Sequence, residues 1–222
     1  MERKMSNEDR KKQIAGWLLY AGQALIAIGL FVFFLLYYPI IAEELGYAFR
    51  DKPTVAPIVS LSPKQTGKTS VIVPVDANYS IVIPKIGANV RVVIGVDPFD
   101  AAAYRKALAD GIAQAKGTKN PGESGNAFFF AHSSDDFMTR GRYNTVFYLL
   151  DKLDIGDRFT IAYQGKLYDY HVFDKKTLAS EQVEYLNAKS KESTVTLMTC
   201  WPPGTDMKRL LVFGVMDAVR VQ

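Results

Sequence analysis

A long uncharged and mostly apolar run near the start of the chain constrains its fold more than any other feature. No charged residue occurs from Gln13 to Ala42. About 20 apolar residues are enough for a helix to span a bilayer. A signal peptide has a shorter apolar region of about 7–15 residues, whereas this run continues to Tyr37, Tyr38 and Pro39. We therefore predict an uncleaved transmembrane anchor over residues 13–42.

The charges on either side of this run predict how the anchor is oriented. Residues 1–12 form a basic tail, and Glu43 and Glu44 follow the apolar run. Basic residues flanking a membrane segment stay on the cytoplasmic side. We therefore expect the tail in the cytoplasm, a single pass through the cell membrane, and everything after about residue 43 outside.

The rest of the chain separates into a linker and one domain. Residues 43–78 are rich in proline, serine, threonine, lysine and glycine, which predicts an extended linker or a segment that docks with little regular structure. A spacer fits this composition better than a lid. Residues 79–222 form the domain. The net charge of +4 includes no long basic run, which argues against a nucleic-acid partner.

Alternating and β-branched patterns predict that the domain is mainly β. Strands are expected at residues 80–84, 88–94, 126–132, 158–163, 166–173, 194–199 and 209–213, with 215–221 as a possible extension. Helical segments are expected at residues 145–153, at 180–186 and at 100–114. In the last of these, Asp100 can cap the helix, and one apolar stripe contains Ala101, Tyr104, Leu108 and Ile112. Seven or eight strands with short helices and no regular β-α alternation predict an antiparallel or mixed β-barrel.

The only cysteine of the chain, Cys200, lies where a predicted strand ends. The segment Trp201-Pro-Pro-Gly204 cannot continue the strand, because proline has no backbone donor. If strands 194–199 and 209–213 pair in the simplest antiparallel register, Cys200 faces Arg209 at a Cα distance of about 5 Å. A neighbouring cation favours the thiolate, and a positioned donor stabilises an oxyanion.

A lone cysteine is otherwise most often a small buried apolar residue. Outside the membrane, however, cysteines usually pair in disulfides, so a single one indicates an intermolecular linker or a thiol kept for chemistry. Of the two histidines, His171 lies within an alternating strand and is interpreted as a plain surface residue. His132 lies at a strand end, as Cys200 does, and is the candidate proton donor.

The acidic pair Asp135 and Asp136 follows His132. A Ca²⁺ site needs a fuller set of oxygen ligands than these two side chains supply. We interpret the pair as a solvated turn and predict no metal site.

These motifs together resemble the sortase family. Residues 196–200 match the TLxTC signature, residues 125–132 resemble the histidine strand of sortases, and Arg209-Leu210 with Val212 matches their arginine strand. The resemblance covers about residues 79–218. It implies an eight-stranded β-barrel in which Cys200, His132 and Arg209 are catalytic, and it makes Thr199 a candidate to orient the substrate or Arg209.

Sortases are transpeptidases of the outer face of the bacterial cell membrane. They cut a motif similar to Leu-Pro-x-Thr-Gly in exported proteins and pass the acyl group to an amine. The resemblance therefore implies a sorting-signal protein and an amine acceptor as partners, the acceptor being a peptidoglycan precursor or a pilin lysine. No cofactor is needed for any step.

Three features depart from familiar sortase patterns and leave the subclass open. The continuation after Cys200, residues 201–204, is unusual, and Asp135-Asp136 stand after His132 where many relatives carry other residues. The linker has no obvious aspartate-aromatic lid motif, and the Asp97-Pro-Phe99 sequence lies inside the domain, where a strand-to-helix turn explains it. Two alternative functions also remain. One is a membrane-anchored endopeptidase of the same fold that uses water, and the other is a non-catalytic cell-surface binding module with a structural thiol.

Overall fold

The computed structural model describes residues 7–49, 57–62, 70–133, 146–180, 190–203 and 205–221. The chain divides into two units, residues 1–50 and residues 51–222. The described part of the first unit is a long helix, α1 (Asn7–Ala48). Its segment Gln13–Leu35 has a mean hydropathy of 2.2 and is long and apolar enough to cross a membrane. The helix extends beyond the predicted anchor at both ends.

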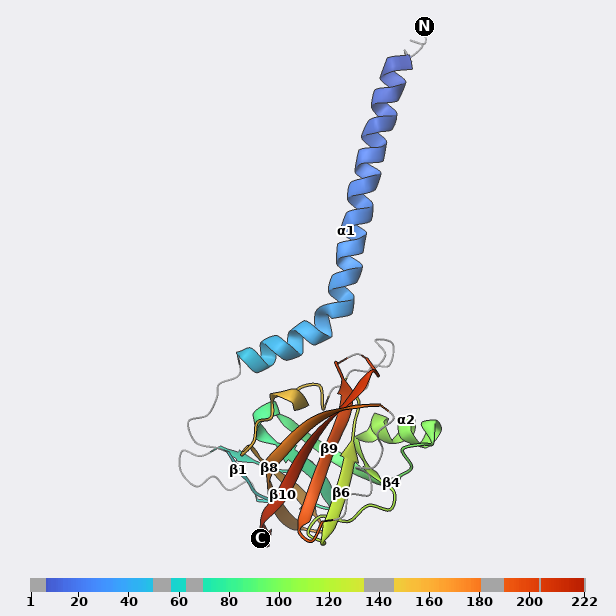
Figure 1. Ribbon diagram of the computed structural model, residues 1–222. Coiled ribbons are helices and arrows are strands. Elements are labelled where there is room, and N and C mark those ends of the chain that lie inside the picture. Colours follow the sequence, from blue (N-terminus) through green and yellow to red (C-terminus); the bar gives the residue numbers. More distant parts are fainter. Residues whose placement is uncertain are drawn as a thin grey trace. The chain divides into compact units, whose positions relative to one another are not determined.

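The second unit is built around a closed barrel of eight strands (Figure 1). The strands are β3 (Tyr79–Ile83), β4 (Ala88–Val96), β5 (Ile112–Ala115), β6 (Gly125–Phe130), β7 (Arg158–Tyr163), β8 (Lys166–Ala179), β9 (Ser193–Trp201) and β10 (Lys208–Val221). Their order around the barrel is β10-β8-β7-β3-β4-β5-β6-β9. The pairs β4–β5 and β6–β9 are parallel, and the other pairs are antiparallel. The predicted eight-stranded barrel is therefore confirmed, as the mixed form.

The eighth strand was not among the predicted ones. The helix predicted over residues 100–114 is shorter, because α2 (Ala101–Asp110) ends at Gly111 and the chain continues as β5. A Cβ atom on Gly111 would lie 2.3 Å from the backbone oxygen of Arg91. Only glycine allows this close approach to β4. Residues 215–221 are the continuation of β10 and not a separate strand.

Asp100 caps the N-terminus of α2, as the sequence predicts. The side chain of Asp100 accepts hydrogen bonds from the backbone N–H groups of Ala102 and Ala103, at 2.9 and 3.1 Å. These are donors that have no partner inside the helix. The start of α2 is thereby held at the turn that follows β4.

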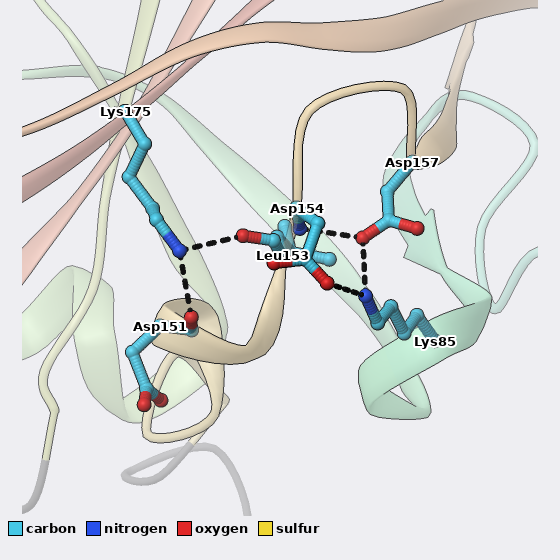
Figure 2. A network of polar contacts seen from close by, with 6 residues as sticks. All are labelled: Lys85, Asp151, Leu153, Asp154, Asp157 and Lys175. Carbon is cyan, nitrogen blue, oxygen red and sulfur yellow. Dashed lines mark hydrogen bonds and ion pairs between the residues drawn. The ribbon is translucent and has the colours of Figure 1, made fainter.

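The helix predicted at residues 145–153 is instead, over its described residues 146–153, a turn followed by the short 3₁₀ helix η2 (Leu150–Lys152). Figure 2 shows why this segment is held in place. The Nζ of Lys175 donates to the backbone oxygens of Asp151 and Leu153, at 2.9 and 2.8 Å. The Nζ of Lys85, in the 3₁₀ helix η1 (Pro84–Ile86), contacts Asp154 and Asp157 at 2.7 and 2.6 Å. Of the predicted helical turn at 180–186, residues 181–186 lie outside the described residues.

Part of the predicted linker docks on the barrel. The short strands β1 (Ile58–Val59) and β2 (Val71–Ile72) pair in parallel. Val59 is 4% exposed and packs against Val82, Ala162 and Leu167. The chain therefore contacts the barrel well before β3 begins.

Candidate active site

The predicted site residues lie at or just beyond three strand ends. Cys200 is the penultimate residue of β9 and Arg209 is the second residue of β10. The two are directly opposite each other in the antiparallel ladder, as the simplest register predicts. His132 follows β6 by two residues. Because β6 runs parallel to β9, with Phe130 opposite Met198, the chain reaches His132 at the end of the barrel that carries Cys200.

A pocket of about 260 Å³ opens beside Cys200 and Arg209. Most of its wall is apolar, so a peptide side chain that enters it leaves water. His132 is not one of the described lining residues, but Tyr104, which contacts its ring, is. The lining residues are Pro98, Phe99, Ala101, Tyr104, Phe130, Ala131, Met198, Thr199, Cys200 and Arg209.

The thiol of Cys200 is half-buried, and its burial raises its pKa above the ordinary value. The guanidinium of Arg209 lowers this pKa, whereas the carboxylate of Asp206 raises it further. The cation thus acts in the direction expected from the sequence, but burial outweighs it. The thiol must therefore lose a proton before or while it attacks a substrate.

Arg209 is held by the turn that connects β9 to β10. Its Nη1 donates to the backbone oxygens of Asp206 and Lys208, at 2.9 and 3.0 Å. A guanidinium carries five N–H donors in a planar fork. The donors on Nε and Nη2 have no hydrogen-bond partner among the described residues, so they remain available to an oxyanion.

Thr199 lies next to Cys200 but is buried, with an exposed fraction of 2%. Its hydroxyl donates to the backbone oxygen of Ala131 at 3.1 Å. The backbone N–H of Ala131 in turn donates to the oxygen of Met198 at 3.2 Å. These two bonds join the strand that carries Cys200 to the segment that carries His132.

Of the ten described pocket residues, only Thr199, Cys200 and Arg209 were singled out as site residues from the sequence. The seven others include a proline and two aromatic residues near the start of α2. Pro98 and Phe99 belong to the turn that precedes α2, and Tyr104 lies on α2 itself. Tyr104 lies on the apolar stripe predicted for that helix. The stripe indicated that its side chain would be buried, but not which residues it would contact. The Asp97-Pro-Phe99 turn was interpreted as a purely structural connection, and it proves to border the pocket as well.

The second histidine of the sequence lies on the surface of the barrel. The Nδ1 of His171 is 2.7 Å from Oδ1 of Asp217, and both side chains are partly exposed on the barrel surface. His171 is thus a surface residue, as predicted. Asp135 and Asp136 lie outside the described residues.

The arrangement combines the parts that acyl transfer requires. A thiol can act as the nucleophile, free guanidinium donors can stabilise a tetrahedral oxyanion, and an imidazole can exchange a proton with an amine. All three groups are brought to one end of the barrel by the ladders of β6, β9 and β10.

Comparison with known proteins identifies similar domains. The family model of the sortase domain matches residues 81–217, which is more than half of the chain. Sortase C1 of GBS pilus island 1 is 30% identical, with a TM-score of 0.54, and the match covers 63% of this chain and 64% of that one. Sortase C-1 from Actinomyces oris is 28% identical, with a TM-score of 0.54 and coverages of 65% and 76%.

Sortase A from Corynebacterium diphtheriae is 25% identical, with a TM-score of 0.54 and coverages of 64% and 60%. The match to this chain therefore spans less than two thirds of sortase C1 and of this sortase A. No curated protein matches the chain significantly.

Proposed function

Because this chain belongs to the sortase family, we propose that it is a membrane-anchored cysteine transpeptidase. Its substrate is an exported protein with a sorting motif similar to Leu-Pro-x-Thr-Gly, and its acceptor is an amine. The observation that carries this proposal is the pairing of Cys200 with Arg209 across the β9–β10 ladder, at the mouth of an apolar pocket.

The proposed reaction proceeds in two halves. Cys200 first loses the proton of its thiol to solvent, and the resulting thiolate attacks the carbonyl carbon of the motif threonine, while the Nε and Nη2 donors of Arg209 stabilise the oxyanion. His132 in its protonated form gives a proton to the departing amine, which leaves a thioester on Cys200. An incoming amine then attacks the thioester, loses its extra proton to His132 and releases the thiolate.

The proposed topology places the catalytic domain on the outer face of a bacterial cell membrane. Residues 13–42 are the single-pass anchor, residues 1–12 are cytoplasmic, residues 43–78 form the linker and residues 79–222 form the catalytic domain. The hydropathy of Gln13–Leu35 and the charges that flank it support this topology. One structural relative is a sortase of a pilus island, which makes a pilin lysine a candidate acceptor alongside a peptidoglycan precursor.

The test uses the full chain in detergent micelles with a library of Leu-Pro-x-Thr-Gly-like peptides. Each reaction contains either a lysine-bearing pilin peptide or a peptidoglycan stem peptide as the acceptor. Ligated product, absent in a Cys200→Ala variant, supports the transpeptidase. Hydrolysis without ligation would indicate an endopeptidase, and tight binding without turnover would indicate a binding module.

A further inference from the structure

Three aromatic rings stand in series beside Cys200: those of Phe130 and Tyr104 line the pocket, and that of His132 contacts Tyr104. The ring of Tyr104 is stacked on that of Phe130, with 5.3 Å between centroids and an angle of 11° between planes. On the same tyrosine, the ring of His132 stands nearly perpendicular, at 5.2 Å and 83°. Both arrangements are favoured geometries for aromatic pairs.

The backbone near His132 is held by β9, but this does not orient the imidazole. The hydrogen bonds from Thr199 and to Met198 act on the backbone of Ala131. The imidazole can still rotate about its two side-chain torsions, so its direction depends on the side chains around it. Tyr104 supplies such a contact from a different element, α2.

Tyr104 is itself held from two sides. Its backbone N–H donates to the oxygen of Asp100 at 2.9 Å, in the first turn of the capped helix. Its ring packs on Phe130, which is 1% exposed inside the barrel wall. A ring fixed both by a helix and by a buried strand residue presents a rigid surface to the imidazole.

We propose that Tyr104 is a positioning residue for His132. It holds the imidazole in the direction from which the protonated ring can reach the departing amine. This inference rests on the proposed transpeptidase function. Loss of this contact should therefore slow proton transfer to the leaving group, and it should not slow attack by the Cys200 sulfur.

The test compares two substrates that share one acyl peptide and differ in the leaving group. The first is the ordinary peptide, whose leaving amine needs a proton. The second is a thioester of the same peptide, whose thiolate leaves without one. Rates of Cys200 acylation are measured with the full chain in detergent micelles, for the unchanged protein and for Tyr104→Leu, Tyr104→Met and Tyr104→Phe.

We expect Tyr104→Leu to lower kcat for the peptide about 10-fold. This is smaller than the whole rate enhancement that a general acid provides, because the variant keeps His132. Its KM and its rate with the thioester should stay within about twofold. Tyr104→Phe keeps the ring and should retain most of the peptide activity. Tyr104→Met fills the space without a ring and should behave like Tyr104→Leu, so that a folding failure of one variant leaves the other.

Phe99→Leu provides a matched control, because it removes an aromatic ring from the same pocket. It should change the rates of both substrates together. Equal losses on peptide and thioester in Tyr104→Leu and Tyr104→Met would overturn the proposal, as would a rise in KM at constant kcat. If the unchanged protein turns over neither substrate, the transpeptidase function itself fails. If it turns over both and the Tyr104 variants match it, only the positioning role fails.

Discussion

Replacement of Arg220 by Met should loosen β1 from the barrel without unfolding the barrel. The guanidinium of Arg220 donates to Asp169 through Nε and Nη2, at 2.5 and 2.7 Å. Its Nη1 donates to the backbone oxygen of Val59 at 2.7 Å. The hydroxyl of Thr160 also donates to Asp169 and fixes that carboxylate. Arg220 is thus pre-oriented toward β1 by a carboxylate that is itself held.

The substitution removes the hydrogen bond from Arg220 to the oxygen of Val59 and leaves the apolar contacts of Val59 in place. A hydrogen bond from a charged donor contributes about 1.5–3 kcal/mol. The side chain of Arg220 is 33% exposed, which places the loss near the lower end, at about 1.5 kcal/mol. The burial of Val59 remains, so the strand stays docked most of the time. A loss of this size raises the population of the opened strand about 10-fold.

Amide hydrogen exchange of the full chain measures this opening directly. The N–H groups of Ile58 and Ser60 donate to Ser70 and Ile72, both at 3.1 Å. In Arg220→Met these two amides should exchange about 10-fold faster, while the amides of β3 should not change.

A matched control for this experiment is Arg158→Met. The side chain of Arg158 is 80% exposed and lies 3.9 Å from Asp217, so its loss should change exchange less than about twofold. Unchanged exchange at Ile58 and Ser60, or equal acceleration in the control, would refute the reasoning.

The remaining predictions concern the site and the helix-to-strand junction. Arg209→Ala should lower turnover of a sorting peptide by about 10²-fold or more, because it removes the oxyanion donors; single-turnover kinetics check this, and a change below about threefold would contradict it. Alkylation of Cys200 by iodoacetamide should rise at higher pH than for a free cysteine, because burial raises the pKa of the thiol, and Asp206→Asn should move the profile to lower pH. The same raised pKa means that the stability contributed by the protonated thiol is present below the unfolded pKa and is lost as pH rises through the folded pKa; Cys200→Ala should therefore weaken the alkaline fall in melting temperature. Gly111→Ala should destabilise the domain by about 1–3 kcal/mol in thermal unfolding, because the new methyl group meets the Arg91 oxygen at 2.3 Å; an unchanged melting temperature would show that the junction can relax.

Most strands of the barrel could be predicted because they extend over five or more residues that alternate or are rich in β-branched and aromatic side chains. The exception, β5, has only four residues, and Ile112 is the only β-branched one among them. Ile112 also continues the helical stripe of α2, which favoured a longer helix. The strand forms because β4 pairs with it in parallel on one side and β6 pairs with Ala113 and Gln114 on the other. Such pairing is a property of the closed barrel and leaves no local signal.

In the candidate site, too, pairing between consecutive strands could be predicted from the sequence, whereas pairing between strands far apart in the chain could not. Cys200 and Arg209 lie on strands that follow each other along the chain, so their register could be predicted from the sequence. The position of His132 depends on a parallel pairing between β6 and β9, which lie far apart in the chain. From the sequence, His132 could be placed at a strand end, but only the order of motifs in the family resemblance indicated that this end lies near Cys200. The direction in which the pKa of Cys200 is shifted depends on the burial of its thiol, which the sequence does not reveal.

The three groups of the site are therefore held by different kinds of contact. Cys200 and Arg209 are set by one antiparallel ladder, which breaks only if the barrel opens. The imidazole of His132 lies two residues beyond its strand and contacts α2 through Tyr104. Under the proposed function, changes in α2 should consequently alter proton transfer at His132 before they alter the positions of Cys200 and Arg209. A variant of α2 that abolished thioester cleavage while the fold persisted would show that the ladder alone does not position Cys200.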